Sequence, residues 1–451
     1  LKNHINKGEI YMRMKDIKQY PDGYLSEMPG FQFSLLSLLF PLWAAAASLN
    51  DILITQFKSV FYLSDFASAL VQSAFYGGYF LIAIPAALLI KKTSYKIAIL
   101  SGLGFYIIGC TLFYPASNMA TYSMFLVAIF VLAIGLSFLE TSANTYSSLM
   151  GPRDKATLRL NISQTVYPIG SIIGVLLGKY LIFQNGASLK SQMSKMTPQA
   201  AKDFGASALQ HTLQPYKYLI LILIVVFILF VITKFPKCKS QNIKGKEETK
   251  VSILETLKYL SKNNNFKKGI IAQFIYVGMQ TTVWSFTIRL ALTLDKNISE
   301  RSASTYMIYT FIAFFLGKFV ANFLMNKFNA SKVLFIYSIV GCLSLLYVTL
   351  SPNFTSVYAA IVASFLFGPC WATIYAETLD SVKDKKYTET AGAIIVMAIV
   401  GGAFIPAIQG LVSDAIGSMQ LSFIVPTICF ALVGIYFYSE MKRFKNISQK
   451  N

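Results

Sequence analysis

The sequence is poor in charged residues and in the residue types that soluble enzymes use for chemistry. Asp, Glu, Lys and Arg together make up 13% of the 451 residues, about half of the ~25% that is usual in soluble proteins. It has only two histidines and five cysteines, with no CxxC, HExxH or Cys/His cluster. These absences argue against a disulfide scaffold, a metal site and an enzyme. We therefore expect neither catalysis nor a bound cofactor.

What the chain has in abundance is apolar residues. They make up 55% of the sequence, and the mean hydropathy is +0.55. Twelve apolar runs of roughly 18–25 residues are each long enough to cross ~30 Å of hydrocarbon as a helix. This pattern predicts an all-α membrane protein with twelve transmembrane helices. The runs lie at 32–57, 67–90, 96–115, 122–149, 160–183, 216–233, 269–293, 303–325, 333–350, 357–378, 388–412 and 420–438.

Basic residues are divided unevenly between the two sides of these predicted helices. If both termini lie on one side, the tails and loops of that side hold 30 Lys and Arg, against 7 in the opposite loops. Cytoplasmic loops of membrane proteins carry such an excess. We therefore expect a multi-pass protein of the plasma membrane with both termini in the cytoplasm. The net charge of +20 then reflects orientation in the lipid bilayer, and no nucleic-acid partner is expected.

A basic segment at 234–268 separates six predicted helices from six others. Two lysines near the end of the second helix, Lys91 and Lys96, recur as Lys327 and Lys332 after the eighth, at an offset of 236 residues. Two such halves around a central site are the architecture of major-facilitator transporters. The predicted parts are an N-tail (1–30), an N-terminal six-helix bundle (31–233), a linker (234–268), a C-terminal six-helix bundle (269–438) and a C-tail (439–451).

Two acidic residues fall inside predicted helices. Asp51 lies toward the end of the first helix, and Glu140 lies within the fourth. Ionisable groups at membrane depth are costly and usually functional, and a carboxyl group away from water holds its proton more readily than one in water. Neither histidine falls in a predicted helix, so these carboxyl groups are the best candidates for proton carriers. A structural hydrogen-bonding role is the alternative for both.

The seventh predicted helix carries amide and aromatic side chains on one face. Gln273, Tyr276, Gln280 and Trp284 follow one another at helical spacing. Amides can bond sugar hydroxyls and aromatic rings can cover the C–H face of a sugar, as in other ligand pockets. Hydrogen bonding between helices is the alternative. Further candidates for sugar binding on other helices are Ser48, Gln72, Tyr76, Asn144, Gln164, Tyr167 and Trp371.

Of the basic residues in or near predicted helices, Arg289 and Lys318 are singled out. Arg289 lies near the outer end of the seventh helix, and Lys318 lies in the eighth. Long basic side chains can reach the membrane surface or pair with an acid. We expect structural roles for both, with Lys318 paired to an acidic residue of a cytoplasmic loop.

Several stretches resemble the L-fucose:proton symporter family of the major facilitator superfamily. They include LNDILITQF, QSAFYGGYF, LETSAN, RLNISQT, QFIYVGMQTTVWSFTIR and IVGGAFIPAIQGLVSDAIG, and the match covers nearly all of 31–438. The resemblance implies bacterial sugar uptake by alternating access, driven by the proton gradient. It also implies that Asp51 and Glu140 are the protonation sites and that Gln164 faces the cavity.

The sequence departs from this family at several expected sugar contacts. Ala47 and Ser48 stand where the family has asparagines, Tyr167 stands in place of another asparagine, and Trp371 in place of a tyrosine. The resemblance therefore supports proton coupling more strongly than it supports specificity for L-fucose. A bulkier tyrosine and tryptophan are expected to reshape the cavity.

We accordingly expect a monomeric importer of a monosaccharide, L-fucose or a related hexose or deoxyhexose, with the proton as coupling ion. A sodium-coupled sugar symporter is the nearest alternative, with Asp51 as a sodium ligand. A transporter-like sugar sensor without net flux is a second. A drug/proton antiporter is disfavoured because the fifth helix lacks a GPxxGG run. A channel would not need paired buried acids.

Overall fold

The protein is almost entirely helical. The computed structural model describes residues 17–183, 189–239, 252–325, 327–384 and 387–448, and a lone bridge between Gln19 and Leu25 is the only β-pairing in that part of the chain. The first half contains α2 (Gly30–Ser37), α3 (Leu39–Val60), α4 (Asp65–Lys92), α5 (Tyr95–Met119), α6 (Tyr122–Leu149), α7 (Ala156–Thr165), α8 (Tyr167–Leu177), α9 (Leu189–Met193), α10 (Pro198–His211) and α11 (Leu213–Ile232). The second half contains α12 (Ile253–Ser261), α13 (Asn264–Leu294), α14 (Glu300–Met325), α15 (Ala330–Leu350), α16 (Thr355–Phe367), α17 (Cys370–Asp380), α18 (Thr388–Met397), α19 (Gly401–Ile416) and α20 (Ile424–Ser448).

Within the described ranges, eleven helical stretches are long and apolar enough to cross a membrane. The remaining membrane helix, the seventh in chain order, is α13. It is 31 residues long, but amide, hydroxyl and guanidinium side chains break up its apolar sequence. These side chains are tolerated because most of α13 is buried against other helices rather than exposed to lipid. The prediction of an all-α fold with twelve membrane helices is therefore confirmed.

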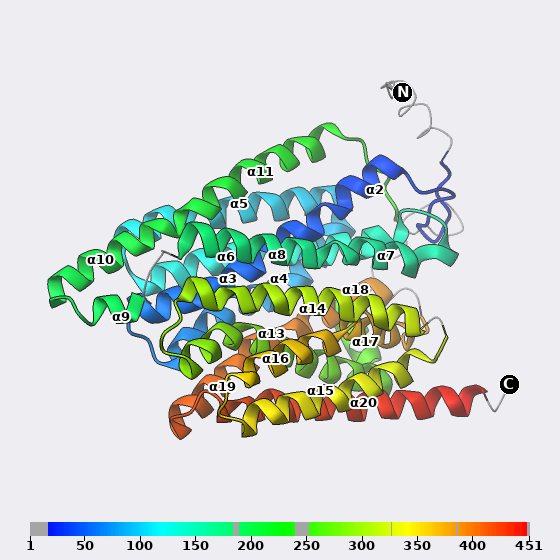
Figure 1. Ribbon diagram of the computed structural model, residues 1–451. Coiled ribbons are helices and arrows are strands. Elements are labelled where there is room, and N and C mark those ends of the chain that lie inside the picture. Colours follow the sequence, from blue (N-terminus) through cyan, green and yellow to red (C-terminus); the bar gives the residue numbers. More distant parts are fainter. Residues whose placement is uncertain (1–16, 184–188, 240–251, 326, 385–386, 449–451) are drawn as a thin grey trace, which may run out of the picture.

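The helices form two bundles that lie against each other (Figure 1). Helices α2–α11 make one layer, and helices α13–α20 make the other. The bundles meet where α4 packs on α18 and α19, and where α8 packs on α14. The start of α2 and the end of α20 lie at the same end of the molecule (Figure 1).

The exact limits of the predicted parts remain predictions. In the structure α13 begins at Asn264, inside the predicted linker, and the linker also contains α12. Its residues 240–251 lie outside the described part of the chain. Helix α20 continues to Ser448, past the predicted start of the C-tail. The stretch between the fifth and sixth membrane spans contributes the short helices α9 and α10.

Three of the membrane spans are interrupted near the middle of the molecule. The fifth span breaks between α7 and α8, where Tyr167 and Pro168 begin the second piece. The tenth breaks between α16 and α17 at Gly368, whose φ of +47° favours glycine, followed by Pro369. A short 3₁₀ turn (η4, Ala398–Val400) joins α18 to α19. Irregular backbone at this depth is tolerated where it is buried in protein or lines a cavity.

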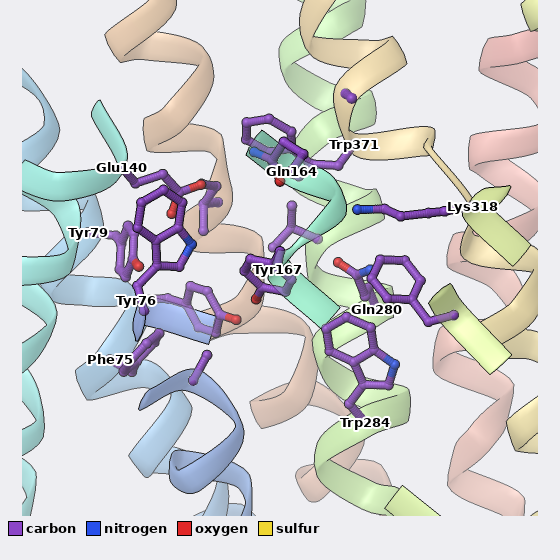
Figure 2. Close-up of a pocket in the computed structure, with 16 residues that line it drawn as sticks. Phe75, Tyr76, Tyr79, Glu140, Gln164, Tyr167, Gln280, Trp284, Lys318 and Trp371 are labelled. Carbon is purple, nitrogen blue, oxygen red and sulfur yellow. The ribbon is translucent and has the colours of Figure 1, made fainter. Parts of the chain in front are cut away.

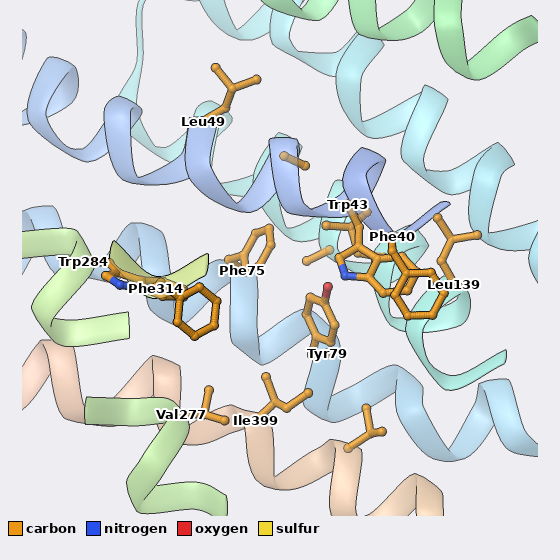
Figure 3. Close-up of a cluster of buried hydrophobic side chains, with 14 of the residues drawn as sticks. Phe40, Trp43, Leu49, Phe75, Tyr79, Leu139, Val277, Trp284, Phe314 and Ile399 are labelled. Atoms are coloured by element: carbon orange, nitrogen blue, oxygen red, sulfur yellow. The ribbon is translucent and has the colours of Figure 1, made fainter. Parts of the chain in front are cut away.

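Bulky apolar side chains from both bundles meet at the centre (Figure 3). Phe40 and Trp43 pack with ring centroids 4.3 Å apart and their planes tilted by 40°, and Trp284 packs edge-on against Phe314 at 5.2 Å. Ile399 lies on the same level from the turn between α18 and α19. This packing limits water at the centre, so electrostatic interactions there are stronger than at a surface.

Close helix contacts give a first prediction about folding. An added Cβ at Gly401 would lie 1.9 Å from the carbonyl oxygen of Phe274, at the contact of α19 with α13. We expect Gly401→Ala to force these helices apart and to cost about 1–3 kcal/mol of folding free energy. The matched change Gly104→Ala meets no atom within 4 Å and should leave stability unchanged or raise it. Thermal unfolding of the purified variants measures both effects, and equal melting temperatures would contradict the prediction.

Candidate functional site

A small cavity lies between the two bundles, at the level of the interrupted helices. Its free space is about 80 Å³. All three tryptophans of the chain line it. The lining residues shown in Figure 2 are Trp43, Ala47, Phe75, Tyr76, Tyr79, Glu140, Gln164, Tyr167, Val277, Gln280, Trp284, Phe314, Lys318, Trp371, Ala372 and Ile399.

Glu140 contributes a carboxylate to the cavity from α6. It lies beside Tyr79 of α4, whose hydroxyl is its hydrogen-bonding neighbour. One helical turn later, the Asn144 side-chain amide donates to the Glu140 backbone oxygen at 3.0 Å. The oxygen of that amide accepts a hydrogen bond from Gln164 Nε2 at 2.9 Å. Asn144 therefore fixes Gln164 next to the acid, and the cavity face of the carboxylate is left for an exchangeable partner.

Asp51 has a different environment, although it is also buried in the centre of the protein. Its Oδ1 accepts hydrogen bonds from Gln72 Nε2 at 2.6 Å and from Ser285 Oγ at 2.7 Å. Gln72 Oε1 in turn accepts a hydrogen bond from Asn50 Nδ2 at 3.1 Å. Asp51 does not line the central cavity. Its carboxylate is held by fixed donors from both bundles, because Gln72 lies on α4 and Ser285 lies on α13.

The amide and aromatic face of α13 reaches the cavity in part. Gln280 and Trp284 line it, and the Gln280 amide donates to the Tyr276 hydroxyl at 3.0 Å. Tyr276 and Gln273 are fully buried and lie outside the cavity wall. Of the face predicted from helical spacing, only the C-terminal half, Gln280 and Trp284, therefore meets the empty space.

The other predicted sugar-binding residues fall into two groups. Those from the N-terminal bundle at the cavity are Tyr76, Gln164 and Tyr167, and Trp371 lines it from α17. Ser48, Gln72 and Asn144 do not line it. Ser48 donates to the Ala44 carbonyl oxygen of its own helix at 3.1 Å, whereas the two amides hold Asp51 and Gln164.

Lys318 departs from its predicted role. We expected it to pair with an acid of a cytoplasmic loop, but its ammonium group points into the central cavity (Figure 2). It lies 4.7 Å from the centre of the Phe314 ring and 5.9 Å from that of Tyr167. No described residue forms a hydrogen bond or ion pair with it. The sequence signal was a lysine set well inside an apolar run, two helical turns before its end. Tyr79 also lines the cavity, although it is not among the residues predicted to bind the sugar.

Arg289 pairs with an acidic residue, which is one of the two roles expected for it. Its Nη1 lies 3.9 Å from an Asp65 carboxylate oxygen and donates to Ser68 Oγ at 2.9 Å. Both partners lie at the start of α4 in the opposite bundle. Arg289 therefore joins the bundles at the end of the molecule where α4 begins.

Two six-helix bundles around a cavity that both of them line define a secondary transporter. The family profile of the Major Facilitator Superfamily matches residues 29–295 and 270–449. An L-fucose-proton symporter of Escherichia coli (strain K12) is 36% identical over 406 residues, which cover 90% of this chain and 92% of that protein. A glucose/galactose transporter of Brucella abortus (strain 2308) is 32% identical over 410 residues, covering 90% and 93%.

Solved structures agree with this assignment. The crystal structure of a Major Facilitator Superfamily transporter, FucP, in the outward conformation superimposes with a TM-score of 0.70 at 34% sequence identity, covering 90% of this chain and 98% of that one. The chain therefore belongs to the L-fucose:proton symporter family of the Major Facilitator Superfamily. The resemblance seen in the sequence motifs is confirmed.

The position of Lys318 gives a second prediction. A cation that faces a low-dielectric cavity without an acidic partner costs folding free energy. We expect Lys318→Met to keep the aliphatic stem and to raise the unfolding temperature by a few degrees. Lys327→Met, at an exposed lysine just after the end of α14, should leave the unfolding temperature unchanged. A lower unfolding temperature for Lys318→Met, measured by differential scanning fluorimetry, would show that the ammonium group is paired and would contradict the prediction.

Proposed function

We propose that the protein imports a monosaccharide, L-fucose or a related hexose or deoxyhexose, together with protons. The observation that carries this proposal is the Glu140 carboxylate, which faces the central cavity alongside amide and aromatic side chains. A carboxylate there can take up a proton without leaving the site. The named activities of the relatives, L-fucose-proton symport and glucose/galactose transport, support a neutral sugar as the substrate.

The proposed sugar site has contributions from both bundles. Gln164 offers an amide from the N-terminal bundle, Gln280 and Lys318 offer an amide and an ammonium group from the C-terminal bundle, and Trp284 and Trp371 offer ring faces. A sugar held between them bonds to both halves, so its binding can draw the bundles together. Tyr76 and Tyr167 complete the wall.

The remaining predicted sugar-binding residues are assigned supporting roles in this proposal. Gln72 holds Asp51, and Asn144 holds Gln164. Ser48, Gln273 and Tyr276 shape the helices behind the cavity rather than contact the sugar in this conformation. Asp51 and Glu140 are proposed as the two proton-coupling sites.

The size of the cavity supports alternating access. About 80 Å³ is roughly half of the ~150 Å³ of an engineered cavity that holds benzene, so it is too little for a hexose. The bundles must therefore move apart on one side to admit the sugar, and on the other to release it. Tyr167 and Trp371, which differ from the family pattern, occupy part of this space.

The excess of basic residues supports an orientation with both termini in the cytoplasm of a bacterial cell and the start of α4 facing outside. In this orientation the bundles 31–233 and 269–438 rock about the central cavity, with 234–268 as their cytoplasmic connection. We propose a functional monomer of the plasma membrane, because each bundle pair encloses its own cavity. The protein moves its substrate without changing it chemically.

The role of Glu140 gives a third prediction. Glutamine keeps the shape of the side chain but cannot release a proton, so Glu140→Gln is expected to lower sugar-driven proton uptake into proteoliposomes by at least tenfold. Exchange of labelled for unlabelled sugar should be retained, because it needs no net proton movement. The control is Glu377→Gln, at a partly buried acid near the cytoplasmic end of α17 that bonds Ser331, outside the cavity.

The outcome decides between coupling ions. Full proton uptake in Glu140→Gln would remove Glu140 as the coupling site. Transport by the unmodified protein that requires sodium and is insensitive to a protonophore would replace the proposal by the sodium-coupled alternative. Sugar binding without any exchange would favour a sensor.

The three tryptophans give a fourth prediction. Trp43, Trp284 and Trp371 are the only ones in the chain and all line the cavity. A sugar that enters the cavity must therefore change the intrinsic tryptophan fluorescence with no contribution from elsewhere. We expect a saturable change on titration with the transported sugar, reduced in Trp371→Phe. Calorimetric binding of a sugar with unaltered emission would place its site outside this cavity.

A further inference from the structure

At the end of the molecule where α4 begins, polar side chains join the two bundles. We call Lys58, Asp65, Arg289, Ser413 and Asp414 the gate cluster. Asp65 pairs with Lys58, accepts a hydrogen bond from Ser413 Oγ at 2.8 Å and lies 3.9 Å from Arg289 Nη1. The two oxygens of the Asp414 carboxylate accept the backbone N–H groups of Asp65 and the following residue, at 3.0 and 2.9 Å.

The two hydrogen bonds of Asp414 stabilise the contact between the bundles at this end. The first N–H groups of a helix have no partner within it, and an acidic group placed there is favoured by both hydrogen bonding and the helix dipole. Here the acid comes from α19 of the C-terminal bundle and the helix start is α4 of the N-terminal bundle. Separating the bundles at this end exposes these groups to water.

One turn of α13 connects this gate cluster to Asp51. Ser285 Oγ donates to Asp51 Oδ1 at 2.7 Å, and the Ser285 backbone oxygen accepts from Arg289 Nε at 3.1 Å. Arg289 then donates to Ser68 of α4 at 2.9 Å. Ser285 and Arg289 are four residues apart and both are buried. The same helical turn therefore carries one contact to Asp51 and one to the gate cluster.

Water can approach this turn from the gate-cluster side. A pocket of about 660 Å³ has Thr55 and Arg289 in its wall, together with Lys58, Ser59 and Tyr62. Thr55 follows Asp51 by one turn of α3, and Arg289 follows Ser285 by one turn of α13. The Thr55 hydroxyl and Arg289 Nη2 are both buried and have no hydrogen-bond partner among the described residues. They are suited to hold water between the pocket and Asp51.

We propose that Ser285 is a coupling residue, whose hydroxyl transmits the protonation state of Asp51 to the gate cluster. An ionised carboxylate accepts a stronger hydrogen bond than a protonated one. Ionised Asp51 therefore holds Ser285, and with it Arg289, against the N-terminal bundle, and keeps this end closed. A proton that reaches Asp51 through the pocket releases Ser285 and lets the bundles part before sugar is admitted. This inference rests on the proposed function, in which Asp51 is a proton site.

Other titratable groups near Asp51 must be separated from this effect. Arg289 on α13, Tyr76 on α4 and Tyr167 on α8 interact with its charge. The gate cluster adds the ionisable side chains of Asp65, Asp414 and Lys58, and the central cavity adds that of Glu140. Replacing Ser285 leaves all of these groups in place, so a change in the pH response of that variant reports on the Ser285 contact itself.

The test measures opening at this end directly. Spin labels are attached to Met119→Cys and Ile416→Cys, both exposed, on opposite bundles and outside the wall of this pocket, after replacement of the five native cysteines. Electron–electron distances are recorded from pH 5.5 to 8.5 in liposomes. In the labelled background protein, the fraction of molecules with the longer, open distance should decline as pH rises. In Ser285→Ala the open population at pH 8.5 should be about tenfold higher, as expected for loss of one hydrogen bond to a charged group.

Three further variants make the test decisive. Ser285→Thr keeps the hydroxyl and should restore the pH response. Thr287→Ala removes a hydroxyl that bonds only its own helix, to the Val283 carbonyl oxygen, and should behave like the background. Asp51→Asn should be open across the whole pH range and serves if Ser285→Ala does not fold. A pH response in Ser285→Ala equal to the background would overturn the inference while leaving proton coupling intact. Absence of proton-coupled uptake in the background protein would instead refute the proposed function.

Discussion

The cost of placing a carboxylate away from water is the physical constraint on which this structure depends. A buried ionised acid must be paired, hydrogen-bonded or protonated. The protein meets this requirement in two ways. Asp51 is bonded by Gln72 and Ser285, which are fixed parts of the protein. Glu140 instead faces a cavity beside Tyr79, where water, a proton or a ligand can take the open position.

The two acids therefore act on different parts of the protein. Asp51 contacts side chains of both bundles, so a change in its charge acts on the interface between them. Glu140 shares a cavity with Gln280 and Lys318 of the opposite bundle, so a change in its charge acts on whatever occupies the cavity. Interrupted helices on both sides supply the local freedom that such changes need, because their backbone already departs from regular helix at Gly368 and before Tyr167.

Much of the fold and part of the site could be predicted from the sequence. Apolar runs longer than 18 residues have one stable form in a bilayer, which is why the twelve helices were predicted correctly. Acids within those runs stand out because a charged group is costly in a bilayer. Gln280 and Trp284 stand out because their helical spacing places them on one face. The family motifs added the assignment that composition and periodicity leave open.

The contacts between distant helices could not be predicted in this way. Helical periodicity places Gln72 and Gln273 on a face, but not whether that face meets the cavity or another side chain. Lys318 was assigned to a loop partner because its depth along α14 and its rotation toward the centre depend on packing with the other bundle. Ser285 was not singled out, since a serine in a polar helix becomes informative only when Asp51 lies 2.7 Å from its hydroxyl.

The most direct test of the central claim is the external pH of de-energised cells that express this protein, recorded as single sugars are added. L-fucose, D-galactose, D-arabinose, D-glucose and L-rhamnose form the first panel. Proton symport predicts alkalinisation of the medium with at least one of these sugars, abolished by a protonophore, and the responding sugar identifies the substrate. Uptake of a labelled sugar from the panel without any change in external pH would contradict proton coupling.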